Sequence, residues 1–83
     1  DRWGGVDVTI DGVNYQIKPL KSFSTEEGLT IVNTYGMRDY TSKNKVDKIA
    51  FANNNEIIVF DNKDYDVLSK GRVVFKQEPK IIR

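Results

Sequence analysis

The stretch GVDVTIDGVNYQIKP, residues 5–19, decides the fold predicted for this chain of 83 residues. Apolar and polar residues alternate over Val6–Ile10 and again over Val13–Ile17, with Asp11-Gly12 between the two runs. An Asp-Gly pair flanked by alternating runs is the strongest short signal for a β-hairpin, because the favoured turn needs two residues with positive φ. We therefore expect two antiparallel strands joined by a two-residue turn.

The predicted hairpin gathers polar side chains on one face. With two residues in the turn, Ile10 lies opposite Val13, and continued pairing brings Asp7 opposite Gln16. Lys18 follows one step along the same face, and directly opposite Cβ atoms lie only about 4.5–5.5 Å apart. A carboxylate, an amide and an ammonium group therefore share one patch. The structural alternative is the ordinary solvated side of a hairpin, for which these residue types are common.

This patch suits the metal-assisted hydrolysis of a phosphodiester. Asp7 and the side-chain carbonyl of Gln16 would hold Mg²⁺ (or Mn²⁺), and the backbone carbonyl of Ile17 between them is a further candidate ligand. The ion would activate water and offset charge on the phosphate. Lys18 would orient that water or stabilise the developing charge. None of these roles requires His or Cys, and the chain contains neither.

The same stretch resembles the active-site hairpin of the PD-(D/E)xK nuclease superfamily, in its Gln-x-Lys-Pro variant. The family has an Asp on one strand, then an acidic residue or Gln, any residue, and Lys on the next strand. Asp7, Gln16 and Lys18 match this pattern, although Gln16 stands where a carboxylate is usual. The resemblance implies a magnesium-dependent endonuclease acting on DNA, with these three as catalytic residues. It also implies a restriction-endonuclease-like α+β (mixed α/β) core, in which a helix and further strands follow the hairpin.

The remaining sequence predicts one helix and several strands. Pro19 is expected to end the second hairpin strand, because proline cannot donate to the ladder. Thr41 or Ser42 would cap a helix running to about Asn53. A helical turn is expected at Ser24–Glu27, and strands are expected at Leu29–Tyr35, at Glu56–Phe60 (buried on both faces) and, as the last strand, at Arg72–Lys76.

Basic residues cluster around the predicted helix. Lys45 and Lys48 are three residues apart and would share one helical face. Together with Lys21, Arg38 and Lys43 they would contact the phosphate backbone of DNA, which gives affinity without reading bases. The alternative, a solvated helix face, is equally compatible with the pattern.

The composition and net charge of the chain exclude several kinds of chemistry. The absence of Cys excludes disulfides and thiol chemistry, and the absence of His excludes an imidazole proton shuttle. The net charge of +1 gives no bulk attraction for nucleic acid. No apolar run approaches the roughly 18 residues that span a bilayer, and no leader peptide is recognisable, so we expect a cytoplasmic protein without membrane contact.

The domain organisation leaves two functions open. The chain is expected to form a single small nuclease-like domain over residues 1–83, possibly a fragment, since the family has an N-terminal helix for which there is no room here. The second hypothesis is a non-catalytic α+β interaction or assembly module of a larger protein. In that case the strand at Glu56–Phe60 and the last strand would support assembly with another chain or segment, as a homodimer or with a missing N-terminal segment.

Overall fold

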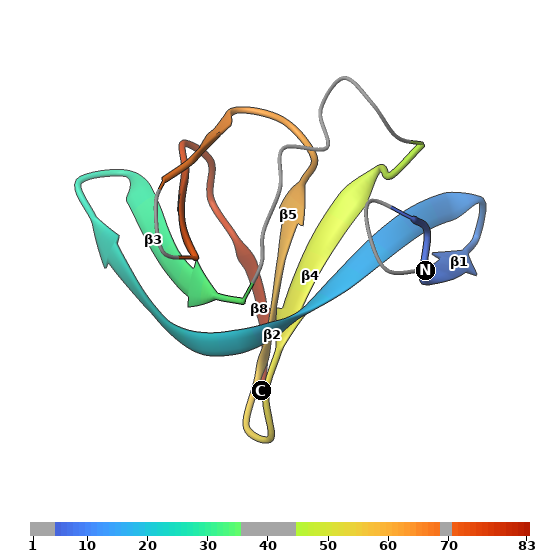
Figure 1. Cartoon of the computed structure of the whole chain (residues 1–83), viewed down its shortest axis with the longest axis horizontal. Helices are drawn as coiled ribbons and strands as arrows, with labels where there is room; N and C mark the ends of the chain where they lie inside the picture. Colours follow the sequence, from blue (N-terminus) through green and yellow to red (C-terminus); the bar gives the residue numbers. More distant parts are fainter. Residues whose placement is uncertain (1–4, 36–44, 69–70) are drawn as a thin grey trace.

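The computed structural model describes residues 5–35, 45–68 and 71–83, which form strands and no helix (Figure 1). None of these residues therefore belongs to a helix able to cross a membrane. The strands are β1 (Val8–Ile10), β2 (Val13–Glu26), β3 (Leu29–Thr34), β4 (Lys48–Ala52), β5 (Ile57–Asp61), β6 (Tyr65–Val67), β7 (Arg72–Phe75) and β8 (Lys80–Ile82).

Strand β2 organises the sheet. Its first half pairs with β1 on one flank and β4 on the other, and its second half pairs with β3. The strand order is β6-β7-β3-β2-β4-β5-β8, with β1 beside β2, and only the β2–β4 pairing is parallel among the described strands. A register shift lies between Leu20 and Ser22, and such an irregularity bends a strand. Figure 1 shows β2 sweeping beneath both halves of the molecule.

The bend in β2 folds the sheet into two layers around an aromatic core. We call β1-β2-β4-β5-β8 the five-stranded layer and β6-β7-β3-β2 the four-stranded layer. Phe60 of the first stacks on Phe75 of the second, with ring centroids 3.8 Å apart, and Phe51 meets Phe75 edge-on at 5.8 Å. Buried aliphatic residues surround these rings: Leu20, Val32, Val46, Ile49, Ile58 and Val73. The core determines which face of each strand points inward.

The predicted hairpin is confirmed in its turn and in the register of its three pairs, from Val8–Tyr15 to Ile10–Val13. The ladder ends at Val8, so the predicted pair of Asp7 with Gln16 is not part of it. Ile10 lies opposite Val13, and Asp11 and Gly12 have φ angles of 51° and 78°. Two consecutive positive φ angles define the type I′ turn, whose twist matches that of the strands it joins.

Strand β2 does not end at Pro19, contrary to the prediction. It continues to Glu26, and Pro19 lies beside Ala52 of β4. On the opposite flank of β2, pairing with β1 ends at Tyr15, and pairing with β3 begins at Leu20. The N–H that proline lacks is therefore not required by a partner strand on that flank.

The α+β, restriction-endonuclease-like fold predicted from the sequence is wrong for the described residues. Residues 41–44 of the predicted helix lie outside them, residues 45–47 are irregular, and the rest of the segment forms β4. Ile49 and Phe51 are both fully buried, and they face Phe60 and Ile58 of β5 across the ladder. This spacing of two is that of a strand, and the tertiary pairing overrides the helical pattern.

Three smaller predictions are also revised. The helical turn predicted at Ser24–Glu27 is the end of β2, followed by a tight turn into the confirmed strand β3. The strand predicted at Glu56–Phe60 is present as β5, but its residues alternate between exposed and buried. The predicted last strand is present as β7, although β8 follows it.

Candidate functional site

Asp7 lies just before β1 and is bound to the backbone of β2. Its N–H donates to the carbonyl of Tyr15 at 2.8 Å, and its carboxylate Oδ2 accepts the N–H of Ile17 at 2.8 Å. The carboxylate oxygen thus accepts the hydrogen bond that a backbone carbonyl would accept if β1 continued further. This fixes an exposed negative charge beside Ile17, whose chain neighbours are Gln16 and Lys18.

Gln16 and Lys18 point into the molecule. They are only 3% and 8% exposed, whereas Ile17 between them is 46% exposed. In the ladder they lie beside Ile49 and Phe51, the inward residues of β4. The structure therefore turns Gln16 and Lys18 toward the core and Ile17 outward, whereas Asp7 and Thr9, which were predicted on the same polar face, are exposed.

We call the buried pair Gln16 and Lys18 the inner site. One acceptor atom of this site lacks a hydrogen bond among the described residues. The side-chain oxygen Oε1 of Gln16 is buried and accepts no hydrogen bond from the part of the chain that the structure describes. A buried acceptor without a partner costs about 1–3 kcal/mol, and in a native fold it calls for an explanation such as a bound ion, a water or a catalytic role. This oxygen is also the atom that the sequence assigned to metal binding.

The donor set offered to a metal is small. Within residues 5–35, 45–68 and 71–83, no three His, Cys, Asp or Glu side chains gather closely enough to hold an ion. The predicted set is of another kind, since it combines the Asp7 carboxylate with the Gln16 amide and the Ile17 carbonyl. Such a set is compatible with Mg²⁺, which binds few protein oxygens and keeps several waters.

The predicted phosphate contacts do not form one ridge. Lys48 is on the outer face of β4, where its ammonium pairs with Asp61 at 3.1 Å. The ammonium of Lys21 lies 3.9 Å from the ring centroid of Tyr35, a cation–π contact. These two lysines are therefore engaged within the chain, at separate places in the fold.

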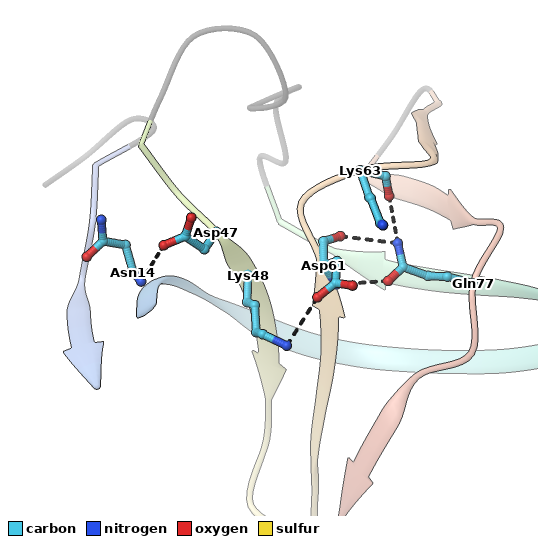
Figure 2. A network of polar contacts seen from close by, with 6 residues as sticks. All are labelled: Asn14, Asp47, Lys48, Asp61, Lys63 and Gln77. Carbon is cyan, nitrogen blue, oxygen red and sulfur yellow. Dashed lines mark hydrogen bonds and ion pairs between the residues drawn. The ribbon is translucent and has the colours of Figure 1, made fainter. Parts of the chain in front are cut away.

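Of the other predicted contacts, only Lys45 lies within the described residues. Lys45 is exposed ahead of β4, and its carbonyl accepts the side-chain amide of Asn14 at 3.0 Å. Asp47 accepts the backbone N–H of Asn14 at 2.8 Å (Figure 2), so this segment is tied to the start of β2. Arg38 and Lys43 lie outside the described residues.

The outer face of the five-stranded layer carries an apolar groove of about 420 Å³. Its floor is formed by the small residues Ala50 and Ala52 of β4. Larger side chains form its walls: Val8, Ile10, Tyr15 and Ile17 from β1 and β2, and Ile57, Val59 and Ile82 from β5 and β8. Three of these, Ile10, Ile17 and Ile82, are between 46% and 53% exposed. A contiguous exposed patch of this kind marks a binding surface.

Three polar residues that line the groove, Lys48, Asp61 and Gln77, belong to one network of hydrogen bonds and an ion pair. Figure 2 shows this network. Gln77 accepts the N–H of Asp61 at 2.8 Å, and its amide donates to the carbonyls of Asp61 at 3.2 Å and Lys63 at 2.6 Å. The Lys48–Asp61 ion pair adjoins this clamp. Gln77 thereby ties the segment leading into β8 to the end of β5, which holds the β8 wall in place. Neither the groove nor the role of Gln77 is predicted from the sequence, because the alternation of polar and apolar residues does not reveal which face of a strand stays exposed.

Comparison of the chain with protein-family models, with curated proteins and with solved structures finds no match. The resemblance to PD-(D/E)xK nucleases therefore stays a prediction from Asp7, Gln16 and Lys18. The structural features that bear on function are the inner site and the outer groove.

Proposed function

We propose that the chain is the core of a magnesium-dependent nuclease that hydrolyses DNA phosphodiester bonds through Asp7, Gln16 and Lys18. The observation that carries the proposal is the buried Gln16 oxygen without a partner. It supports a ligand at this position, because leaving an acceptor unpaired has no stabilising role of its own. The carboxylate of Asp7, held by the N–H of Ile17 at 2.8 Å, adds a fixed negative charge at the same level of β2.

Each side chain then has a distinct task. Asp7 and Gln16 would hold Mg²⁺ or Mn²⁺ through a carboxylate and an amide oxygen, with the Ile17 carbonyl adjoining. The ion, when bound, supplies positive charge against the phosphate and polarises water. Lys18 carries a second positive charge on the same side of β2, where it would stabilise charge on the phosphate. DNA would approach from the exposed edge at Asp7, since Gln16 and Lys18 lie beneath the surface.

Cleavage of supercoiled DNA in Mg²⁺ or Mn²⁺ tests this proposal. We expect nicking by the native chain, and a loss of roughly 100-fold or more in Asp7→Asn and Lys18→Met, because each variant removes a charge that acts on the phosphate or the ion. Asp66→Asn is the matched control, since Asp66 is an exposed carboxylate paired with Lys76 at 3.2 Å. Circular dichroism of every variant excludes loss of fold. An inactive native chain, or equal cleavage by all variants, would refute the proposal.

A second function, that of a non-catalytic interaction module within a larger assembly, is favoured by the outer groove. The surface is lined by exposed Ile10, Ile17 and Ile82. A contiguous exposed apolar patch is typical of a protein–protein interaction site. This surface and the inner site lie on opposite faces of β2, so the two functions do not compete for residues. Both proposals keep the cytoplasmic location expected from the sequence.

A further inference from the structure

We propose that the turn at Asp11 and Gly12 is a site of spontaneous modification, at which Asp11 isomerises to isoaspartate and the hairpin of β1 and β2 opens. The modification needs no enzyme, since its only co-reactant is water. The two turn residues set the register of the hairpin, but they belong neither to the inner site nor to the lining of the outer groove. The proposal therefore rests on neither of the functions proposed above.

The reaction passes through a cyclic imide. The backbone nitrogen of Gly12 attacks the side-chain carbon Cγ of Asp11, a new C–N bond forms, and the carboxyl hydroxyl leaves with the amide proton as water. Water then adds to one of the two ring carbonyls. Opening at Cγ restores aspartate, whereas opening at the original backbone carbonyl leaves a main chain that runs through Cβ and Cγ. One water is released and one is taken up, and no electrons are transferred.

The two reacting groups are accessible. Asp11 and Gly12 are both exposed, and among the described residues only the chain neighbours of Gly12 lie within 4 Å of the point where a side chain would begin. The carboxylate of Asp11 forms no hydrogen bond or ion pair with the described part of the chain. The ladder starts at the pair Ile10–Val13, so the Gly12 amide lies outside it. Neither group has to leave a partner before it reacts.

The backbone of the turn needs one change to reach the geometry of the ring. Ring closure fixes ψ of the aspartyl residue near the value of about −120° that the first central residue of a type II′ turn has. Type I′ and type II′ turns both have a positive φ at this residue, and Asp11 already has a φ of 51°. The two turns differ by a flip of the peptide unit between the central residues, which reverses the sign of φ at the second one. Glycine tolerates both signs, so Gly12 permits the flip.

Asp64 shows what protects an aspartate with the same backbone angle. Its φ of 55° is close to that of Asp11, but its carbonyl accepts the N–H of Lys76 at 2.8 Å, and the next residue, Tyr65, is buried. A flip of the peptide unit after Asp64 would break this hydrogen bond and displace a buried residue. Of all aspartates in the sequence, only Asp11 precedes glycine. Exposure, a positive φ and a following glycine therefore combine at Asp11.

Isoaspartate at this position opens the hairpin. It adds one carbon atom to the main chain of the turn, so the two-residue connection that matches the twist of the strands is lost. Strand β1 has three residues, all exposed, and among the described strands it pairs with β2 alone. Its loss also frees Asp7, which is held at 2.8 Å by the Tyr15 carbonyl and by the Ile17 N–H. The pairing of β2 with β4 does not involve the turn, so the change stays within the hairpin.

The test ages the ¹⁵N-labelled native chain in warm neutral buffer, without metal or DNA. Isoaspartyl methyltransferase serves as a reagent that labels isoaspartate, and mass spectrometry of proteolytic peptides locates the label. We expect isoaspartate to accumulate at Asp11 and not at Asp64. In NMR spectra the modified fraction should lose the native amide signals of Thr9 and Ile17 and keep those of β7.

Asp11→Gly is the matched control. Glycine tolerates the positive φ at this position, and Gly-Gly is a favoured pair in two-residue hairpin turns. Residue 11 then has no carboxyl group with which to close the ring. The aged variant should therefore keep its Thr9 and Ile17 signals, which separates isomerisation from every other effect of ageing.

A parallel sample aged in urea gives the extent of the reaction in the unfolded chain. If isoaspartate forms in urea but not in the folded chain, the native turn protects Asp11 and the proposal is overturned. Equal amounts at Asp11 and Asp64 would overturn it as well, since the turn would then confer no selectivity. If aged Asp11→Gly loses the same signals as the native chain, or if the modified native chain keeps them, isomerisation does not open the hairpin.

Discussion

Replacing Gln16 with Met should make the protein more stable, which is unusual for a buried residue. Gln16 is 3% exposed, and its Oε1 has no hydrogen-bond partner. Met has a similar length, adapts to irregular space and carries no strong acceptor. The substitution therefore removes an unpaired group and keeps most of the packing beside Ile49 of β4.

The expected gain follows from two opposing contributions. The unpaired acceptor costs about 1–3 kcal/mol, whereas imperfect repacking of a buried side chain costs up to about 1 kcal/mol. With a value of about 2 kcal/mol, the middle of the first range, the net increase in the free energy of unfolding is about 1–2 kcal/mol. In a domain of this size each kcal/mol shifts Tm by about 4–8 °C, so Tm should rise by about 4–16 °C.

Urea and thermal unfolding in a chelator, followed by circular dichroism, measure this effect. Gln77→Met is the matched control, since Gln77 makes hydrogen bonds of 2.6, 2.8 and 3.2 Å and should lose about 1–3 kcal/mol on the same change. A Gln16→Met protein less stable than the native chain would refute the reasoning. It would mean that Oε1 is satisfied and gives no reason to expect a ligand.

Adding Mg²⁺ extends the experiment to the proposed site. An ion that binds only the folded chain stabilises it by RT ln(1 + [L]/Kd), or about 1.4 kcal/mol at ten times Kd. The native chain should gain this amount, and Gln16→Met should gain less because one ligand oxygen is gone. An equal gain in both proteins would place the ion elsewhere.

Four further substitutions test the fold and the hairpin. Gly71→Ala should destabilise by about 2–4 kcal/mol in urea unfolding, because φ is +72° and the new Cβ would collide with the Thr34 carbonyl. Gly12→Ala, with φ of +78° and open space around it, should cost only about 1–2 kcal/mol, and equal losses would contradict the collision. Phe75→Ala removes the ring that stacks at 3.8 Å in the core and should cost about 3–5 kcal/mol, seen as lost NMR dispersion; a native-like spectrum would contradict the core. Asp7→Asn should speed hydrogen exchange of the Ile17 amide and leave the amides of β7 unchanged, since its effect is confined to one bond of 2.8 Å.

The hairpin was predictable because its signal is local. Asp11 and Gly12 both adopt the positive φ angles that their residue types tolerate, and the two-residue turn then sets the register of β1 against β2. The strands at β3 and β7 were predictable for a similar reason, since their β-branched residues favour extended backbone.

The strand β4 was not predictable in the same way. Lys48–Ala52 contains adjacent apolar residues that fit a helix as well as a strand, and short apolar runs of this kind are ambiguous. The choice is made by β2 and β5, which pair with this segment on both sides. The pairs with β2 join residues 33 positions apart, such as Tyr15 and Lys48, so no local pattern records them.

The orientation of the hairpin is the feature on which both functions depend, and it too is set by distant contacts. The alternation of polar and apolar residues predicts that Gln16 and Ile17 face opposite sides of β2. It does not predict which of the two sides the rest of the fold covers. In the structure the Gln16 side is covered, which leaves a polar atom unpaired and aliphatic side chains exposed. Such a conflict between the local sequence pattern and the overall fold is typical of functional sites. Substitutions at these two adjacent residues therefore test the orientation of the hairpin. Gln16→Met should stabilise the chain. Ile17→Asp, at a residue that is 46% exposed, should change the free energy of unfolding by only about 0.5 kcal/mol. If Ile17→Asp instead unfolds the chain while Gln16→Met has no effect, the covered face is the apolar one. The inner site would then be open to solvent, and the groove would be part of the core.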